Sequence, residues 1–202
     1  MTKIVGITGG IGSGKTTLSN HLRKLGYLVH ESDVVVSEMY AKPKKKFLSF
    51  IKEKISKDIV YHNKINKTEI ANVIFNNKTT KKLLETHIHK EVKNSRDAFI
   101  KKNKNNKNKF IFADIPLLFE NKLEKDFDLV VCIISSEKNR IKRVLENKKF
   151  TKENLNKILK AQTTDKERKK RSQIIINNNK TKKDFIFSAE RVLKGLIKWE
   201  KL

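Results

Sequence analysis

The sequence predicts an α/β fold of three layers, in which a mostly parallel five-stranded sheet is covered by helices on both faces. Two observations support this prediction. Five short apolar runs with the length of buried strands alternate with segments whose apolar residues recur at helical spacing along the 202-residue chain. In addition, five of the seven glycines lie between Gly6 and Gly14, within and directly after the first apolar run. This cluster marks a tight backbone turn between the first strand and the first helix.

The turn after the first strand has the sequence of a phosphate-binding loop. Residues 9–16 fit the pattern G-x-x-x-x-G-K-[ST] in full, between a strand at 4–7 and a helix that begins near Gly14. Glycines let the backbone curl around phosphates, Lys15 can reach the β- and γ-phosphates, and the Thr16 hydroxyl can ligate Mg²⁺. We therefore expect ATP and Mg²⁺ as ligands. The residues expected to bind ATP here are Gly10, Ile11, Gly12, Ser13, Gly14, Lys15, Thr16 and Thr17.

The remaining elements follow in order along the chain. Further buried-strand patterns lie at residues 27–30, 110–114, 129–134 and 174–176. Helical spacing dominates residues 34–100, which we interpret as a helical insertion, and returns in a basic stretch at 137–171 and in a last amphipathic helix. The sequence thus predicts three parts: a nucleotide-binding core of residues 1–33, 101–135 and 172–202, an insertion of residues 34–100, and a helical segment of residues 136–171.

Two acidic residues follow strands at the edge where parallel sheets bind their ligands. Asp114 ends the run 110–114, where a P-loop protein places the carboxylate that orients Mg²⁺ or its water. Asp33 follows the second strand and is the best-placed carboxylate to accept the proton of an acceptor hydroxyl, although it could also be the N-cap of a helix from Val34. Because the Asn-Lys-x-Asp signature of guanine recognition is missing, these features indicate a small kinase.

Charge and composition argue against other classes of protein. The 47 lysines and arginines and 22 acidic residues give a formal net charge of +25. Most of the excess is lysine, spread along the chain without interleaved aromatic residues, so we expect no specific nucleic-acid partner. The lone cysteine, Cys132, lies in the run 129–134 and is expected to be a buried strand residue. No apolar run approaches the roughly 18 residues of a membrane span and no leader precedes the first strand, so we expect no membrane partner and a cytoplasmic location.

Three motifs together resemble the dephospho-CoA kinase family. They are residues 8–17, the triplet Glu31-Ser32-Asp33, and the string Asp114-Ile115-Pro116-Leu117-Leu118-Phe119-Glu120. The resemblance spans nearly the whole chain, because further family motifs match Leu84-Glu85, His89, Arg143, Ala161-Gln162 and Asn178. It implies a P-loop NTPase fold with a helical CoA-binding insertion and a lid formed by residues 136–171. It also implies transfer of the γ-phosphate of ATP to the ribose 3′-hydroxyl of dephospho-CoA, which gives CoA and ADP.

The resemblance implies roles for individual residues. Asp33 would be the general base, Lys15 would contact the phosphates, and Arg143 would act from the lid, which makes these three the expected catalytic residues. Asn178 would lie near the adenine of ATP. The expected metal-binding residues are Thr16 and Asp114, and the expected acceptor-binding residues are Asp33, His89, Asp114 and Leu117.

Two departures from the family pattern concern arginines. Ser37 and Asn147 stand where the family has arginine, and lysine does not reproduce the bidentate grip of arginine on phosphate. The candidates to supply the missing lid charge are Arg140, Lys148 and Lys149.

Two other functions stay open from the sequence alone. A nucleoside monophosphate kinase would share the loop, the lid and the inserted acceptor domain. A nucleic-acid-stimulated P-loop ATPase would account for the positive charge. The sequence also leaves the oligomeric state open.

Overall fold

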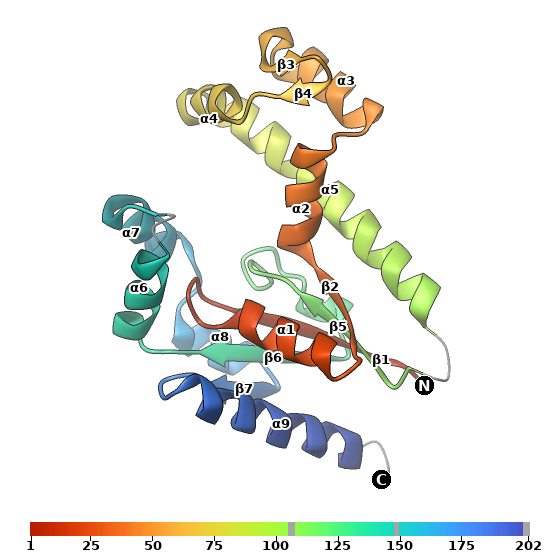
Figure 1. The fold of residues 1–202 in the computed structure, drawn as a ribbon, viewed down its shortest axis with the longest axis vertical. Coiled ribbons are helices and arrows are strands. Elements are labelled where there is room, and N and C mark those ends of the chain that lie inside the picture. Colours follow the sequence, from red (N-terminus) through yellow and green to blue (C-terminus); the bar gives the residue numbers. More distant parts are fainter. Residues whose placement is uncertain (105–107, 148–149, 200–202) are drawn as a thin grey trace. The chain divides into compact units, whose positions relative to one another are not determined.

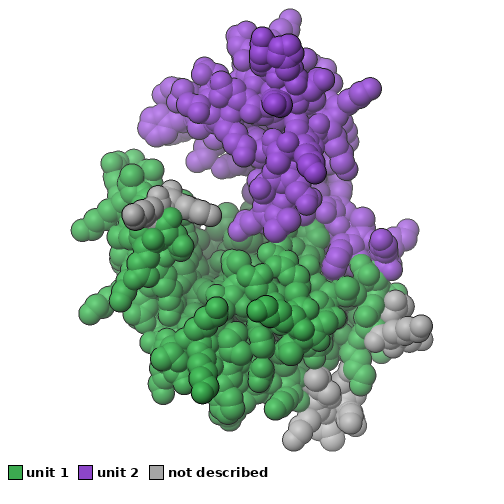
Figure 2. Space-filling view, in the orientation of Figure 1, with its two compact units in different colours: residues 1–31, 103–202 green, residues 32–102 purple. Residues whose placement is uncertain are grey.

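The chain forms two compact units in a computed structural model, which describes residues 1–104, 108–147 and 150–199. Unit 1 comprises residues 1–31 and 103–202, and unit 2 comprises residues 32–102 (Figure 2). Unit 2 includes the whole insertion expected at residues 34–100 and begins directly after the second strand. The helices expected to form a lid belong to unit 1.

Unit 1 is built on one five-stranded sheet in which every pair of neighbouring strands is parallel (Figure 1). The strand order β2-β5-β1-β6-β7 puts β1 in the centre, so the loop that follows β1 leaves from the middle of the carboxyl edge. The parallel sheet predicted from the sequence is confirmed. Its strands are β1 (Lys3–Gly9), β2 (Leu28–Glu31), β5 (Phe110–Asp114), β6 (Leu129–Ile134) and β7 (Ile174–Asn177).

The basic stretch after β6 is helical, as expected, and its described residues form three short helices. Each begins at a hydroxyl residue, Ser136, Thr151 or Thr164, whose side chain accepts a hydrogen bond from a backbone N–H of the first turn. No helix among the described residues combines the length and apolarity needed to cross a membrane. The helices are α1 (Lys15–Lys24), α6 (Glu137–Glu146), α7 (Lys152–Ala161), α8 (Asp165–Arg171) and α9 (Lys182–Trp199), with a 3-10 turn η2 (Glu124–Asp126).

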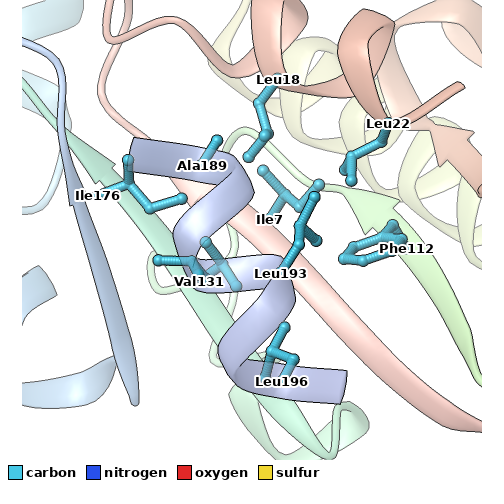
Figure 3. Close-up of a pocket in the computed structure, with 10 residues that line it drawn as sticks. Ile7, Leu18, Leu22, Phe112, Val131, Ile176, Ala189, Leu193 and Leu196 are labelled. Carbon is cyan, nitrogen blue, oxygen red and sulfur yellow. The ribbon is translucent and has the colours of Figure 1, made fainter. Parts of the chain in front are cut away.

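The main core lies between the sheet and the helices α1 and α9 (Figure 3). Side chains that alternate along the strands meet leucines that recur at helical spacing on the two helices, as the sequence pattern predicts. The pocket at their centre holds only about 10 Å³, so this side of the sheet is packed tightly. The residues around it are Ile7, Phe112, Val131 and Ile176 from the strands and Leu18, Leu22, Ala189, Leu193 and Leu196 from the helices.

The opposite face of the sheet is covered by α8 and by the chain that follows β5. A Cβ atom at Gly6 would lie 3.0 Å from both Leu118 and Phe127, so only glycine lets these side chains approach the strand so closely. Cys132 is fully buried in β6, as expected. Burial raises the pKa of its thiol to about 11, which keeps the sulfur protonated and makes it a poor nucleophile near neutral pH.

Unit 2 contains four helices, in line with the expected helical insertion, and one small hairpin. The sequence analysis did not predict the hairpin. The two strands of the hairpin are joined by His62 and Asn63, both in the left-handed conformation with φ of 47° and 59°. A turn of this type is usually predicted from a glycine, and because the turn contains none, the sequence analysis did not predict the hairpin. The elements are α2 (Ser32–Ala41), α3 (Lys45–Lys54), η1 (Lys57–Ile59), β3 (Val60–Tyr61), β4 (Lys64–Ile65), α4 (Lys67–Asn76) and α5 (Lys78–Asn103).

Unit 2 has its own apolar core, formed by residues from all of these elements except α2 and β3. Next to this core, the imidazole of His87 on α5 stacks on the ring of Phe50 on α3, with 3.8 Å between ring centroids. Burial is the main cause that lowers the pKa of His87, so this ring is neutral at pH 7 and packs as an aromatic residue. The core residues are Phe47, Leu48, Ile51, Ile59, Ile65, Ile70 and Leu84.

Replacement of Leu193 tests the role of α9 in the core. Leu193→Ala should lower the free energy of unfolding by about 2–5 kcal/mol, because the surrounding side chains are packed too tightly to fill the cavity. Urea unfolding followed by circular dichroism measures this change. The matched control is Leu25→Ala at the end of α1, where the side chain is 49% exposed and the expected change is within about 0.5 kcal/mol. Equal losses in the two variants would contradict the assignment of Leu193 to the core.

Candidate active site

The phosphate-binding loop connects β1 to α1 through backbone conformations that favour glycine. Gly12 and Gly14 have φ of 73° and 111°, in the left-handed region. A Cβ atom at Gly14 would lie 2.4 Å from Nδ2 of Asn178, so the chain after β7 reaches the loop only because this position has no side chain. The loop has the strained, open backbone that the motif predicts.

Three side chains donate hydrogen bonds to carbonyl groups of this loop. Lys15 Nζ lies 3.0 Å from the Gly9 carbonyl oxygen, and Asn178 Nδ2 lies 2.7 Å from that of Ser13. The guanidinium of Arg143 lies 3.4 Å from the carbonyl oxygen of Gly12. Carbonyl oxygens repel phosphate, and these bonds hold them against the protein. The loop can then direct N–H groups at an anion, apart from those of Ile11 and Ser13, which donate to Gln162 and to the Gly10 carbonyl.

Asp114 lies at the carboxyl end of β5, beside Ile7 of β1. Its carboxylate accepts a hydrogen bond of 3.0 Å from the hydroxyl of Ser19 on α1, and both residues are buried. The side chain of Thr16, at the start of the same helix, is exposed. A fixed carboxylate and an accessible hydroxyl are hard oxygen donors, a set that suits Mg²⁺ bound together with phosphates. These residues therefore fit the expected metal.

The sequence analysis did not identify Ser19. It lies four residues after Lys15 on α1, so one face of this helix carries the two residues in successive turns. This spacing is the only signal that could have indicated it, because a serine in a helix has no specific pattern of its own.

Arg143 and Asn178 lie together at the carboxyl ends of β6 and β7. Arg143 donates to the Asn178 carbonyl at 2.8 Å and to the hydroxyl of Ser135 at 3.0 Å, and that hydroxyl donates to the same carbonyl at 2.7 Å. Both terminal nitrogens of Arg143 therefore donate to oxygens of the protein, which joins α6 to the ends of these strands. Asn178 contacts Ser13 of the loop, so both expected residues lie at the loop and support its backbone.

A cluster of four charged residues lies on the other side of the loop. Arg140 of α6 and Arg168 of α8 both approach Gly10, where a Cβ atom would lie 2.3 Å and 3.3 Å from their respective guanidinium nitrogens. Asp165 pairs with both arginines, at 3.8 Å and 2.8 Å. Glu120 pairs with Arg168 at 3.4 Å. Of these four, the sequence analysis weighed only Arg140 as a source of charge, because the partners are brought together by the fold.

The segment between α7 and α8 is tied to the loop and to the end of the family-specific string. Gln162 Oε1 accepts a hydrogen bond of 3.0 Å from the backbone N–H of Ile11. The next residue, Thr163, donates its backbone N–H to the carboxylate of Glu120 at 2.7 Å. Glu120 thus anchors this segment so that Gln162 reaches the loop, which gives a physical reason for the glutamate that ends the string 114–120.

The remaining expected residues lie elsewhere. Asp33 is in the first turn of α2, two residues after the end of β2, and His89 is exposed on α5, so both belong to unit 2. Leu117 follows β5 in unit 1 with a partly exposed side chain. Lys148 and Lys149, two candidates for the missing lid charge, lie outside the described residues.

Removal of the Ser19 hydroxyl tests whether it orients the metal-binding carboxylate. In Ser19→Ala, Asp114 loses the donor that fixes it, so we expect the Mg²⁺ concentration for half-maximal ATP turnover to rise about tenfold. Titration of activity with Mg²⁺ measures this. Ser188→Ala on α9, which loses only an exposed hydroxyl bonded to a helix carbonyl, is the matched control and should titrate like the unmodified protein. A Ser19→Ala variant with an unchanged titration would show that Asp114 needs no such support.

Comparison with known proteins identifies the family. A family model described as dephospho-CoA kinase matches residues 3–184. The dephospho-CoA kinase of Fusobacterium nucleatum is 32% identical over 191 residues, which cover 93% of this chain and 95% of the relative. Two solved structures share the fold. A Thermus thermophilus protein has a TM-score of 0.78 and 24% identity, and the match covers 97% of this chain and 96% of that protein. The dephospho-CoA kinase of Campylobacter jejuni has a TM-score of 0.74 and 22% identity, and the match covers 99% of this chain and 100% of that protein. With the loop, the fixed Asp114 and the anchored Glu120 already in place, these matches show that the chain belongs to the dephospho-CoA kinase family.

Proposed function

We propose that this chain transfers the γ-phosphate of ATP to the ribose 3′-hydroxyl of dephospho-CoA, giving CoA and ADP in the last step of coenzyme A biosynthesis. Membership of the family supports the acceptor, and the phosphate-binding loop with Lys15 and Thr16 supports the donor. The observation that carries the proposal is the buried Asp114 carboxylate, which Ser19 fixes at the carboxyl end of the strand beside β1. A carboxylate at this position is what phosphoryl transfer from a P-loop nucleotide requires.

The parts of the chain divide the substrates between them in this proposal. Residues 34–100 hold dephospho-CoA, with contributions from His89 and from Leu117, and residues 136–171 form the lid over ATP. The adenine lies near Asn178, because the chain after the last strand borders the loop. We propose the cytoplasm as the location, because the chain belongs to a family of metabolic kinases.

The proposed transfer step is a single displacement at phosphorus. The 3′-oxygen attacks the γ-phosphorus, the bond from that phosphorus to the β–γ bridging oxygen breaks, and ADP leaves. Asp33 accepts the proton of the 3′-hydroxyl as the new bond forms. Lys15 neutralises charge on the β- and γ-phosphates. Thr16 and Asp114 would hold Mg²⁺, which would supply further positive charge to the phosphates.

A panel of acceptors tests the proposed substrate. With ATP and Mg²⁺, dephospho-CoA should give ADP and CoA in equal amounts, and mass spectrometry should place the added phosphate on the 3′-hydroxyl. AMP, GMP, UMP and CMP should not replace dephospho-CoA, and RNA or DNA should not stimulate ATP hydrolysis. If a nucleoside monophosphate is phosphorylated and dephospho-CoA is not, the proposal is wrong.

Replacement of Asp33 tests the general base. Asp33→Asn keeps the size of the side chain but cannot accept a proton, so the turnover number should fall by about 10²-fold or more while ATP and dephospho-CoA still bind. Steady-state kinetics together with equilibrium binding separate these two effects. Asp184→Asn, which changes an exposed acid in the first turn of α9 as Asp33 is in the first turn of α2, is the matched control with unchanged turnover. Normal turnover in Asp33→Asn would refute the assigned role.

A further inference from the structure

The position of the missing lid arginine carries no cation in this chain. Asn147 is the C-cap residue of α6, and its amide Nδ2 donates to the carbonyl of Arg143 at 2.9 Å. The side chain of Asn147 is therefore used to end the helix. Phosphoryl transfer places negative charge on three equatorial oxygens, and arginine is well suited to neutralise it because its donors are planar and fixed. In this chain, another guanidinium has to supply the positive charge that an arginine at position 147 would place beside the phosphates.

Arg140 is held with its guanidinium against the phosphate-binding loop. The residue is only 8% exposed, and its Nε donates to the Ser135 carbonyl oxygen at 3.1 Å, which fixes the direction of the side chain. One terminal nitrogen lies 2.3 Å from the position that a Cβ atom would take at Gly10, so it touches the loop backbone itself. Glycine at position 10 leaves the space that this nitrogen occupies.

The nitrogen of Arg140 that faces the loop has no hydrogen-bond acceptor among the residues that the structure describes. The other terminal nitrogen faces Asp165 at 3.8 Å, an ion pair longer than a hydrogen bond. The Arg140 side chain is 10% exposed and its terminal nitrogens are open to solvent, so an anionic oxygen bound at the phosphate-binding loop can replace water at this donor. Arg140 therefore combines a fixed charge with a free donor directed at the loop.

Asp165 and Arg168 keep Arg140 in this state. Arg168 is 2% exposed and forms the shorter bond to Asp165, at 2.8 Å, while Glu120 pairs with its other terminal nitrogen. The carboxylate of Asp165 is thus committed mainly to Arg168, and Arg140 is only loosely paired. Two carboxylates balance two guanidiniums, which makes the buried cluster tolerable without ATP.

Arg143 differs from Arg140 in this respect. Its terminal nitrogens donate to the Asn178 carbonyl and the Ser135 hydroxyl at 2.8 Å and 3.0 Å, both ordinary hydrogen-bond lengths. Arg143 joins the ends of two strands to α6 and supports the loop from behind. Its geometry is that of a positioning residue.

We propose that Arg140 contacts the β- and γ-phosphates of ATP and supplies the charge that Asn147 lacks, with the Ser135 carbonyl as the acceptor that positions it and Arg168 as the residue that draws the competing Asp165 carboxylate away from it. This inference rests on the proposed function for the identity of the nucleotide. It assigns the phosphate contact to the loop-facing nitrogen of Arg140 and assigns Arg143 to the support of the loop.

The test compares the affinities for ATP and for AMP, measured by equilibrium binding without any acceptor. AMP keeps the base, the ribose and one phosphate, so a contact to the β- and γ-phosphates changes the ratio of the two affinities, whereas a structural role changes both alike. Arg140→Gln should weaken ATP binding about tenfold or more, the usual size of a charge-assisted hydrogen bond, and leave AMP binding nearly unchanged. Arg140→Lys should recover part of the loss.

The matched control is Arg171→Gln on α8. The guanidinium of Arg171 pairs with Glu124, donates to the Phe119 carbonyl and lies 4.7 Å from the centre of the Phe119 ring. It is a partly buried, paired arginine of the same segment whose partners lie outside the loop, so its removal should leave the ratio of ATP to AMP affinity unchanged.

Three outcomes would overturn the proposal: an unchanged ratio in Arg140→Gln, an equal loss of both nucleotides, or the same selective loss in Arg171→Gln. If Arg140→Gln does not fold, Asp165→Asn decides the question, because removal of the competing carboxylate should raise the ratio, and an unchanged or lower ratio would contradict the contact. The binding assay contains no dephospho-CoA. A protein that makes no CoA but loses ATP selectively in Arg140→Gln would disprove the proposed acceptor and leave this inference standing.

Discussion

The active site depends on one constraint, which is that the carbonyl groups of the phosphate-binding loop must be held away from the phosphates. A loop that turns its N–H groups inward leaves its carbonyls without partners in regular secondary structure. Here Lys15, Asn178 and Arg143 donate to the carbonyls of Gly9, Ser13 and Gly12. These donors come from three elements far apart in the sequence, so the shape of the loop depends on the correct folding of unit 1 as a whole.

The order of the strands explains how these donors reach the loop. With β1 in the centre of a parallel sheet, the carboxyl ends of β5 and β6 lie directly on either side of it, and that of β7 lies one strand further. Asp114 leaves β5 on one side, while Ser135 and Asn178 follow β6 and β7 on the other. The carboxylate of Asp114 and the amide of Asn178 therefore lie on opposite sides of β1, each at the end of a strand. The tight core under α1 and α9 holds this arrangement rigid.

The sequence predicts the parts of this site that depend on local pattern. The strand periodicity gives all five strands, and the loop motif gives its residues, because both are determined by neighbours in the chain. Periodicity does not reveal the division of residues 137–171 into three helices. The local signal for each new helix is a single hydroxyl residue at its N-cap, Thr151 or Thr164. Nor does periodicity reveal the hairpin at 60–65, where His62 and Asn63 adopt a conformation usually left to glycine.

The parts that sequence pattern misses are contacts between distant residues. Glu120 belongs to a string that is easy to recognise, yet its partners Thr163 and Arg168 lie 43 and 48 residues later in the chain. Ser19 supports Asp114 across 95 residues. The family resemblance assigns the lid role to Arg143, and it names Arg140, three residues earlier on the same helix, only as one candidate for the missing charge. Only the positions of the oxygens around them separate a guanidinium with occupied donors from one with a free donor.

That separation bears on the large positive charge of the chain. A net charge of +25 spread over lysines raises the local concentration of any anion, but it selects none, because exposed ammonium groups are screened by salt and are free to move. Selection requires a charge that is desolvated, fixed and short of partners. In unit 1, Arg140 is largely buried, fixed and only loosely paired beside the loop, while the partly exposed carboxylates of Asp165 and Glu120 pair more closely with Arg168. The recognition of a triphosphate therefore rests on one incompletely paired arginine more than on the many lysines of the surface.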